Sequence, residues 1–191
     1  MRRKLFVLSG PSGVGKTTIV RAVLREVPNL EFSVSCTTRP PRAGEREGVD
    51  YHFISAARFA ELVQAGAFLE HAWVYGHRYG TLRAEVERSL ARGKSVLLDI
   101  DTQGARAIYL KLKRGRLDLP AKFIFILPPS REELRRRLAG RGSESAEELE
   151  RRLEETWDQI AAGLWFDYLV VNRDLGEAIS WVARLIRMES G

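Results

Sequence analysis

The chain has little cysteine and no long apolar run. Its 191 residues include one cysteine, Cys36, so no disulfide can form within the chain. This usage predicts a reducing, cytoplasmic compartment. A membrane-spanning helix needs about 18 or more consecutive apolar residues, and no segment approaches that length, so we expect no membrane partner. Residues 1–4 lead directly into an apolar run, without the h-region and cleavage site of a secretory signal.

Histidine is also scarce, and the basic residues are not gathered into one block. The histidines, His52, His71 and His77, have no spacing typical of metal ligands, so we expect no metal cage built by the protein alone. The net charge is +6, but arginines alternate with glutamates, as in residues 147–155, which is typical of a solvated helix. We therefore expect no specific nucleic-acid partner, and weak RNA binding at low salt stays open as a side property.

A phosphate-binding loop is the most informative motif in the chain. Gly10-Pro11-Ser12-Gly13-Val14-Gly15-Lys16-Thr17 matches G-x-x-x-x-G-K-[ST] at every position. An apolar run before it predicts a strand, and the helical spacing that begins at Thr18 predicts a helix after it. Backbone N–H groups and the helix N-terminus should therefore converge on a polyphosphate such as that of ATP, which residues Gly10 to Thr18 are expected to bind. Lys16 can neutralise the β- and γ-phosphates, and the Thr17 hydroxyl can bind Mg²⁺.

Apolar runs typical of buried strands alternate with helical patterns along most of the chain. The expected strands are residues 5–9, 32–37, 95–100, 122–127 and 168–171. The expected helices are residues 17–27, 102–113, 131–138, 146–161 and 175–188. This alternation predicts an α/β fold with a mostly parallel sheet covered on both faces, and ligands at the carboxyl ends of its strands.

Residues 39–93 break this alternation. They contain a proline-rich turn, a short strand at 51–54, a helix at 56–65, a strand at 68–74 and a turn-rich segment at 75–80. We interpret them as a small α+β lobe inserted into the larger fold. A second polar segment, residues 139–145, contains glycines between two predicted helices and is typical of a lid.

Further motifs follow in one order over nearly the whole chain. They are FSVSCTTR at 32–39, PRAGE at 41–45, GVDYHF at 48–53, YGT at 79–81, LDIDTQG at 98–104, FILPPS at 125–130, RLAGRG at 137–142 and VN at 171–172. Together with the phosphate loop they resemble the guanylate kinases, which transfer a phosphoryl group from ATP to GMP or dGMP with Mg²⁺ as cofactor. The resemblance implies a single domain, 1–191, with a three-layer P-loop kinase core (1–38, 94–138 and 153–191), an inserted α+β GMP-binding lobe (39–93) and a helical lid (139–152). Its substrates would be the small molecules ATP and GMP, and the sequence leaves monomer or homodimer open.

The resemblance also implies which residues hold GMP. Guanine presents N1–H and N2–H₂ donors beside its O6 acceptor, so one carboxylate can accept from both donors while hydroxyls donate to O6. Adenine would set the N1 lone pair against that carboxylate. The residues implied at the base are Glu70, Ser35, Thr81 and Asp101. Those implied at the GMP phosphate are Arg39, Arg42, Tyr51 and Tyr79, with Glu45 orienting an arginine or contacting the ligand.

Phosphoryl transfer asks the protein for positioning and for charge neutralisation. The residues implied at the transferring phosphoryl group are Lys16 and, from the lid side, Arg137, Arg141 and Arg152. Asn172 is implied at ATP. Asp99 ends an apolar strand close to the phosphate loop and, with Thr17, can hold Mg²⁺, partly through water.

The chain departs from the family pattern at a few positions. Cys36 stands where relatives often have a small hydroxyl residue, and we interpret it as a packed side chain. His77 and Arg78 replace an Asn-Tyr pair. Two other functions stay open: a scaffold-type interaction module, which typically loses the phosphate loop, and a kinase for another acceptor, against which Glu70 and its neighbouring hydroxyls argue.

Overall fold

The structure is a computed structural model that describes residues 3–139, 153–154, 160 and 165–191. The predicted lid beyond Ala139 and most of the predicted helix 146–161 lie outside these residues. So do Arg141 and Arg152, two of the arginines predicted at the phosphoryl group. In the described part of the chain, no helix combines the length and the apolar character needed to cross a bilayer.

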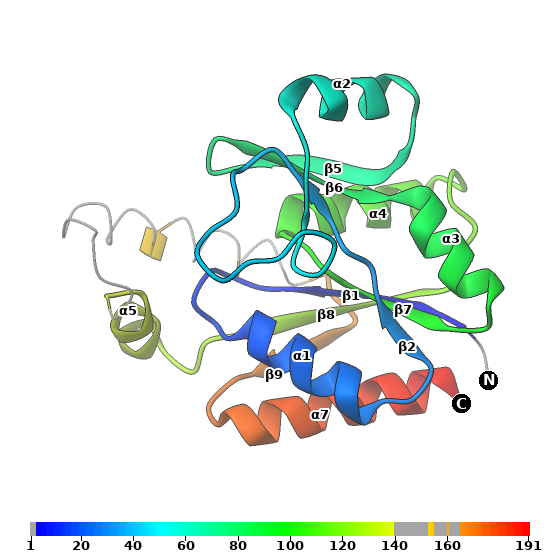
Figure 1. Cartoon of the computed structure of the whole chain (residues 1–191). Coiled ribbons are helices and arrows are strands. Elements are labelled where there is room, and N and C mark those ends of the chain that lie inside the picture. Colours follow the sequence, from blue (N-terminus) through cyan, green and yellow to red (C-terminus); the bar gives the residue numbers. More distant parts are fainter. Residues whose placement is uncertain (1–2, 140–152, 155–159, 161–164) are drawn as a thin grey trace.

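The larger sheet is parallel throughout and confirms the predicted α/β class (Figure 1). Its strands, in spatial order, are β2 (Leu30–Phe32), β7 (Ser95–Asp99), β1 (Leu5–Ser9), β8 (Ala121–Leu127) and β9 (Tyr168–Val171). Consecutive side chains of a strand point to opposite faces, so strands that are apolar at every position require cover on both sides. The central β1 is buried along its whole length.

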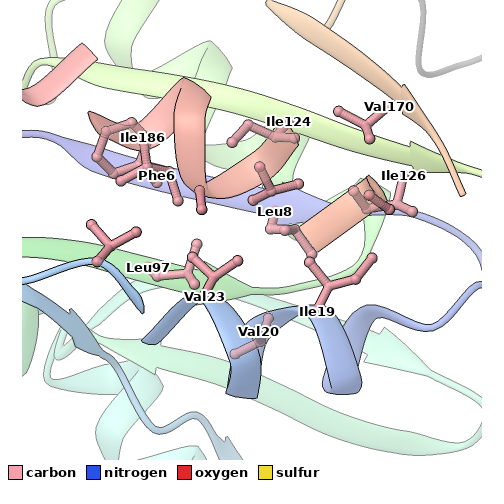
Figure 2. Packing of buried hydrophobic residues seen from close by; sticks show 14 of the residues in the cluster. Phe6, Leu8, Ile19, Val20, Val23, Leu97, Ile124, Ile126, Val170 and Ile186 are labelled. Carbon is pink, nitrogen blue, oxygen red and sulfur yellow. The ribbon is translucent and has the colours of Figure 1, made fainter. Parts of the chain in front are cut away.

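Helices cover both faces of this sheet and complete the three layers. On one face, α1 (Lys16–Glu26) and α7 (Leu175–Ser190) pack against Phe6 and Leu8 of β1 (Figure 2). On the other face, α3 (Arg83–Ala91) and α4 (Thr102–Lys113) pack against Leu5 and Val7. Helix α5 (Arg131–Ala139) follows β8. The alternating residues of one strand thus belong to two separate cores.

A second sheet of four strands forms the inserted region. Its order is β4 (His52–Phe53), β3 (Cys36–Thr37), β6 (His77–Leu82) and β5 (Phe68–Val74). Helix α2 (Ala56–Gln64) begins at the Ser55 cap, whose hydroxyl accepts a hydrogen bond from Arg58 N, and it packs Phe59 on the ring of Phe68. The sheet and α2 lie on one side of the core in Figure 1.

The structure differs from the sequence-based prediction in three places. The single strand expected at 32–37 is two strands: β2 pairs with β7 in the core, whereas β3 pairs with β6 in the smaller sheet. The turn-rich segment at 75–80 is largely strand, because Tyr75 and Gly76, both with positive φ, form a two-residue hairpin turn and pairing resumes at His77. Helix α3 was not predicted, and it packs on the core through Val86. The division into β2 and β3 and the packing of α3 depend on residues far apart in the chain, whereas the turn at 75–76 is local.

Candidate active site

The phosphate loop joins β1 to α1 and takes a conformation that requires glycine. Gly10, Gly13 and Gly15 have φ values of 147°, 81° and 96°. A Cβ at Gly10 would lie 2.5 Å from the Ile126 carbonyl oxygen, and a Cβ at Gly15 would lie 2.8 Å from Asn172 Nδ2. The loop is therefore pressed against β8 and the end of β9, which leaves its amides and the start of α1 for an anion.

Lys16 and Asp99 bring opposite charges to the loop. Lys16 Nζ donates to the carbonyls of Gly10 (2.6 Å) and Pro11 (3.1 Å), so the side chain folds back over the loop. Burial raises the pKa of Asp99 at the end of β7, and the nearby Lys16 ammonium opposes that rise. Both side chains line the same cleft as Thr17.

Asn172 and Arg137 connect the end of β9 to the loop and to α5. Asn172 is buried, and its Nδ2 donates to the Val14 carbonyl at 2.7 Å. Arg137 donates to the Asn172 carbonyl at 3.3 Å and, through Nε, to Glu133 at 2.7 Å. Asn172 thus buttresses the phosphate loop from behind.

A buried carboxylate, Glu70, lies on β5 beside the start of α4. Thr81 Oγ1 on the neighbouring β6 donates to Glu70 Oε1 at 2.6 Å. Glu70 is 4% exposed, and burial raises its pKa to about 7 although the Thr81 hydrogen bond opposes the rise. Asp101 caps α4 by accepting from Gly104 N at 2.8 Å, and burial raises its pKa as well. We call Ser35, Glu70, Thr81 and Asp101 the base site.

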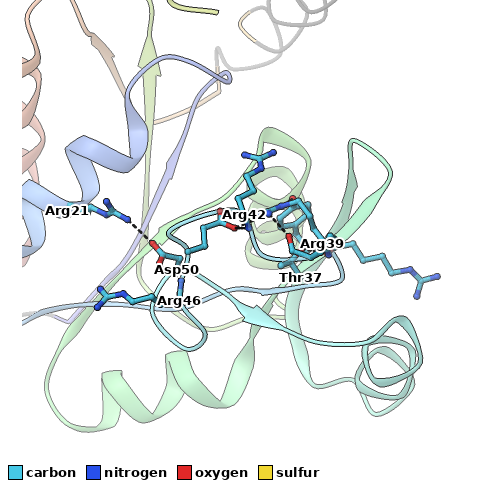
Figure 3. A network of polar contacts seen from close by, with 10 residues as sticks. Arg21, Thr37, Arg39, Arg42, Arg46 and Asp50 are labelled. Atoms are coloured by element: carbon cyan, nitrogen blue, oxygen red, sulfur yellow. Dashed lines mark hydrogen bonds and ion pairs between the residues drawn. The ribbon is translucent and has the colours of Figure 1, made fainter. Parts of the chain in front are cut away.

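Arg39 is held rigidly at the end of β3. Its guanidinium forms two parallel hydrogen bonds to Glu45, of 2.9 and 2.8 Å, and its Nε donates to Tyr79 Oη at 3.2 Å. Glu45 raises the pKa of Arg39, and Arg39 lowers that of Glu45. Glu45 also accepts from the Arg42 backbone N–H at 2.7 Å, which fixes the loop that carries both arginines (Figure 3).

Tyr51 lies next to Arg39, and an ion pair ties the same lobe to the core. The Arg39 guanidinium lies 5.5 Å from the centre of the Tyr51 ring. Burial, and then Asp99, raises the pKa of Tyr51 to about 12, so its hydroxyl stays a donor. On the core side, Arg21 of α1 donates to Asp50 at 2.7 Å (Figure 3). Cationic and hydroxyl donors therefore gather where the lobe meets α1.

One cleft of about 710 Å³ is lined both by the phosphate loop of the core and by residues of the inserted lobe. Its lining includes the phosphate loop with Lys16, the base-site residue Glu70, and Arg42. A polyphosphate at the loop and a second anion near Arg42 could meet there, with a buried acid available for a base edge.

Comparison with known proteins agrees with this geometry. The family model for guanylate kinase matches residues 2–189. A guanylate kinase from Symbiobacterium thermophilum is 50% identical over 97% of this chain and 85% of its own length, and one from Thermus thermophilus is 51% identical over 94% and 79%.

The chain belongs to the guanylate kinase family. A crystal structure of guanylate kinase from Anaplasma phagocytophilum has the same fold, with a TM-score of 0.78 and 35% identity, over 99% of this chain and 87% of that one. Scaffold modules of this fold typically lack the loop that this chain retains in full.

Most of the residues that the family resemblance implies gather at the cleft. Those in its lining are Gly10, Pro11, Ser12, Gly13, Gly15, Lys16, Thr17, Thr18, Ser35, Arg42, Tyr51, Glu70, Tyr79, Asp99 and Asp101. Others stand behind this lining: Arg39 and Glu45 hold one another, Thr81 holds Glu70, and Val14 and Asn172 hold the loop. Within the described part of the chain, Arg137 is linked to the loop through the Asn172 carbonyl.

The sequence reasoning missed two sets of cleft residues. Ile100 and Gln103 flank Asp101 and the start of α4, and Ala72, Trp73, Val74 and Tyr75 form the tip of the β5–β6 hairpin. The Tyr-Gly pair at 75–76 was the available signal, since a hairpin turn there would extend both strands toward the cleft.

Proposed function

We propose that the chain transfers the γ-phosphoryl group of ATP to GMP or dGMP, giving ADP and GDP or dGDP. The observation that carries this proposal is that a phosphate loop with its lysine and a buried carboxylate, Glu70, line one cleft. The reaction needs two anionic nucleotides held end to end. We also infer a reducing, cytoplasmic compartment, from the one buried cysteine, and a monomer or homodimer.

At the donor end, the loop amides and the start of α1 bind the phosphates of ATP. Lys16 exchanges the carbonyls of Gly10 and Pro11 for phosphate oxygens and neutralises the charge that develops during transfer. Arg137, together with Arg141 and Arg152, would supply further positive charge. Asn172 would act on ATP through the loop that it supports.

At the acceptor end, Glu70 accepts from guanine N1–H and N2–H₂ while the hydroxyl of Ser35 donates to O6. Thr81 keeps the carboxylate in place, and Asp101 borders the base. Arg42, Tyr51 and Tyr79 bind the GMP phosphate next to the fixed Arg39–Glu45 pair. A base such as adenine presents a lone pair at N1, which would face the buried Glu70 carboxylate without a hydrogen bond, so the site rejects it.

The residues present suit Mg²⁺. Thr17 and Asp99 offer a hydroxyl and a carboxylate in the same cleft, which are the hard oxygen ligands that this ion prefers. Mg²⁺ commonly takes one or two protein ligands and completes its shell with phosphate and water. When bound, it would neutralise the β- and γ-phosphate oxygens of ATP. Burial raises the pKa of Asp99, whereas the Lys16 ammonium and a bound dication would both favour its ionised form.

A coupled assay of ADP release tests the proposal. With Mg·ATP, we expect fast turnover with GMP and dGMP and a kcat/KM lower by about 10⁴-fold with AMP. UMP and CMP serve as further acceptors in parallel. No ADP release with any acceptor would favour the scaffold module, and an equal rate with another monophosphate would favour a different kinase.

A further inference from the structure

We infer that Gly104, in the first turn of α4, is a positioning residue that makes the site selective for guanine. It leaves room for the Glu70 carboxylate, and a side chain here would displace that carboxylate. The inference rests on the proposed function, since it assumes that Glu70 recognises guanine.

Space, rather than backbone conformation, explains a glycine at this position. Gly104 does not belong to the glycines with positive φ, and it lies in a regular helix. In a helix, alanine is more stable than glycine, so local preference argues against glycine here. A Cβ at this position would lie 2.5 Å from Glu70 Oε2, 3.1 Å from its Cδ and 3.2 Å from Asp101 Oδ1. Real Cβ atoms essentially never come within 2.5 Å of another atom, so the glycine allows the helix to meet the carboxylate.

Three contacts keep the helix and the strand in this position. Asp101 caps α4 by accepting from Gly104 N at 2.8 Å. Two turns further along the same helix, Lys111 Nζ donates to the Leu69 carbonyl of β5 at 2.5 Å. Thr81 holds the other oxygen of Glu70 at 2.6 Å. The Lys111 bond ties α4 directly to β5, whereas the other two contacts fix the start of α4 and one oxygen of Glu70. The end of the Glu70 side chain, with its second oxygen, is therefore the part that can yield.

A displaced carboxylate affects one substrate more than the others. GMP needs both oxygens of Glu70 in line with N1–H and N2–H₂, so a rotation that moves Oε2 weakens GMP binding. ATP binds at the phosphate loop, and AMP gains nothing from the carboxylate. A change at Gly104 should thus separate the KM for GMP from the KM for ATP.

The test compares Gly104→Ala with Gly176→Ala. Gly176 is a matched control, because it also lies in a first helical turn behind an aspartate cap, and a Cβ there would lie 3.2 Å from Asp174 Oδ1, outside the lining of the cleft. We expect Gly104→Ala to raise the KM for GMP by about tenfold or more. The ratio of kcat/KM for GMP to kcat/KM for AMP should fall by the same factor. The KM for ATP should stay within about twofold, and Tm should not fall, since alanine favours the helix. Gly176→Ala should change none of the kinetic values.

Shortening the carboxylate provides the second variant. Glu70→Asp withdraws the group by one methylene, so the double variant Glu70→Asp/Gly104→Ala should lose less GMP affinity than the two single losses multiplied together. The inference would be overturned if the loss of GMP affinity in the double variant equalled the product of the two single losses. An unchanged KM for GMP in Gly104→Ala would overturn it as well. Failure of both Gly104 variants to fold would overturn it too, since the glycine would then serve the fold.

Glu70→Gln separates this inference from the proposed function. If Glu70→Gln raises the KM for GMP and Gly104→Ala does not, the positioning role of Gly104 is contradicted, whereas the proposed function is supported. If Glu70→Gln also leaves GMP binding unchanged, the proposed base site itself falls, and the inference falls with it.

Discussion

Asn172, just beyond the end of β9, donates a hydrogen bond from Nδ2 to the Val14 carbonyl in the phosphate loop, at a distance of 2.7 Å. The two residues are 158 positions apart in the sequence, and both are buried. The same Nδ2 lies 2.8 Å from the place that a Cβ at Gly15 would take. The last strand of the sheet thereby supports the loop that follows the first one.

Removal of this support should loosen the loop. Asn172→Ala leaves the buried Val14 carbonyl without its donor, which should cost about 1–3 kcal/mol of the free energy of unfolding. The KM for ATP should rise more than the KM for GMP, because the loop binds ATP. Urea unfolding and steady-state kinetics measure the two effects. Asn172→Asp, of equal size but without the donor, should be no better than alanine, and wild-type stability of both variants would contradict the prediction.

Lys16 should matter for turnover and little for folding. Lys16→Met removes the cation at the transferring phosphoryl group and keeps the apolar stem, so kcat should fall by about 10²-fold or more. Thermal unfolding should change little, because the two loop carbonyls that Lys16 bonds lie at the cleft, where water can replace the lysine. Lys94→Met, at an exposed pair with Asn29, is the control. A Lys16 variant with near-wild-type kcat would contradict the role of the loop.

GMP binding should depend on pH through Glu70. Because burial raises the pKa of Glu70 to about 7, the free site is protonated below that pH and one oxygen no longer accepts from guanine. The KM for GMP should rise by up to about tenfold per pH unit from pH 7 to pH 5, while Glu70→Gln should have a high KM with a flat profile. A wild-type KM independent of pH in this range would contradict a Glu70 carboxyl that titrates near pH 7 while it binds guanine.

The same shift has a consequence for stability. The folded protein binds this proton more tightly than the unfolded chain, whose carboxyl has a pKa near 4.5. The stabilisation is complete below about pH 4.5 and is lost as the pH rises through about 7. Relative to Glu70→Gln, the wild type should therefore lose stability between pH 5 and pH 8 in urea unfolding.

GMP binding should depend on the geometry of the Arg39–Glu45 pair as well as on its charge. Arg39→Lys keeps the charge but cannot form the two parallel hydrogen bonds, so the loop that carries Arg42 loses its anchor. We expect the KM for GMP to rise on the order of tenfold. Arg58→Lys alters a pair with Glu61 that is mostly exposed, and it should leave kinetics and stability almost unchanged. Equal behaviour of the two variants would argue against a role for Arg39 in the acceptor site.

Closure of the lobe on the core is a further prediction. In-line transfer brings the reacting oxygens within about 3–3.5 Å, and nucleotides cannot enter or leave a cleft that is always so narrow. A bisubstrate dinucleotide that links adenosine to guanosine should therefore reduce the radius of gyration in small-angle scattering. An unchanged radius, with the ligand shown to be bound, would contradict closure.

Local patterns in the sequence determined the class of fold and the phosphate loop. Strand β1 is apolar at four consecutive positions, Leu5 to Leu8, which requires cover on both faces. The loop motif carries its own geometry in its glycines. The family motifs include Arg39 and Tyr79, and the resemblance that they carry implied Glu70.

The tertiary structure decided which of these residues meet. Between β2 and β3 the chain passes from the larger sheet to the smaller one. This depends on pairing with β7 and β6, which no local pattern reveals. Asn172 was predicted at ATP, yet it reaches Val14 because β9 ends behind the loop. The backbone of α4 does not require glycine at position 104. The reason for Gly104 becomes visible only in the packing of α4 on β5, where the buried Glu70 carboxylate leaves no room for a Cβ. Such contacts join positions far apart in the chain, so the physics that selects them acts only in the folded protein.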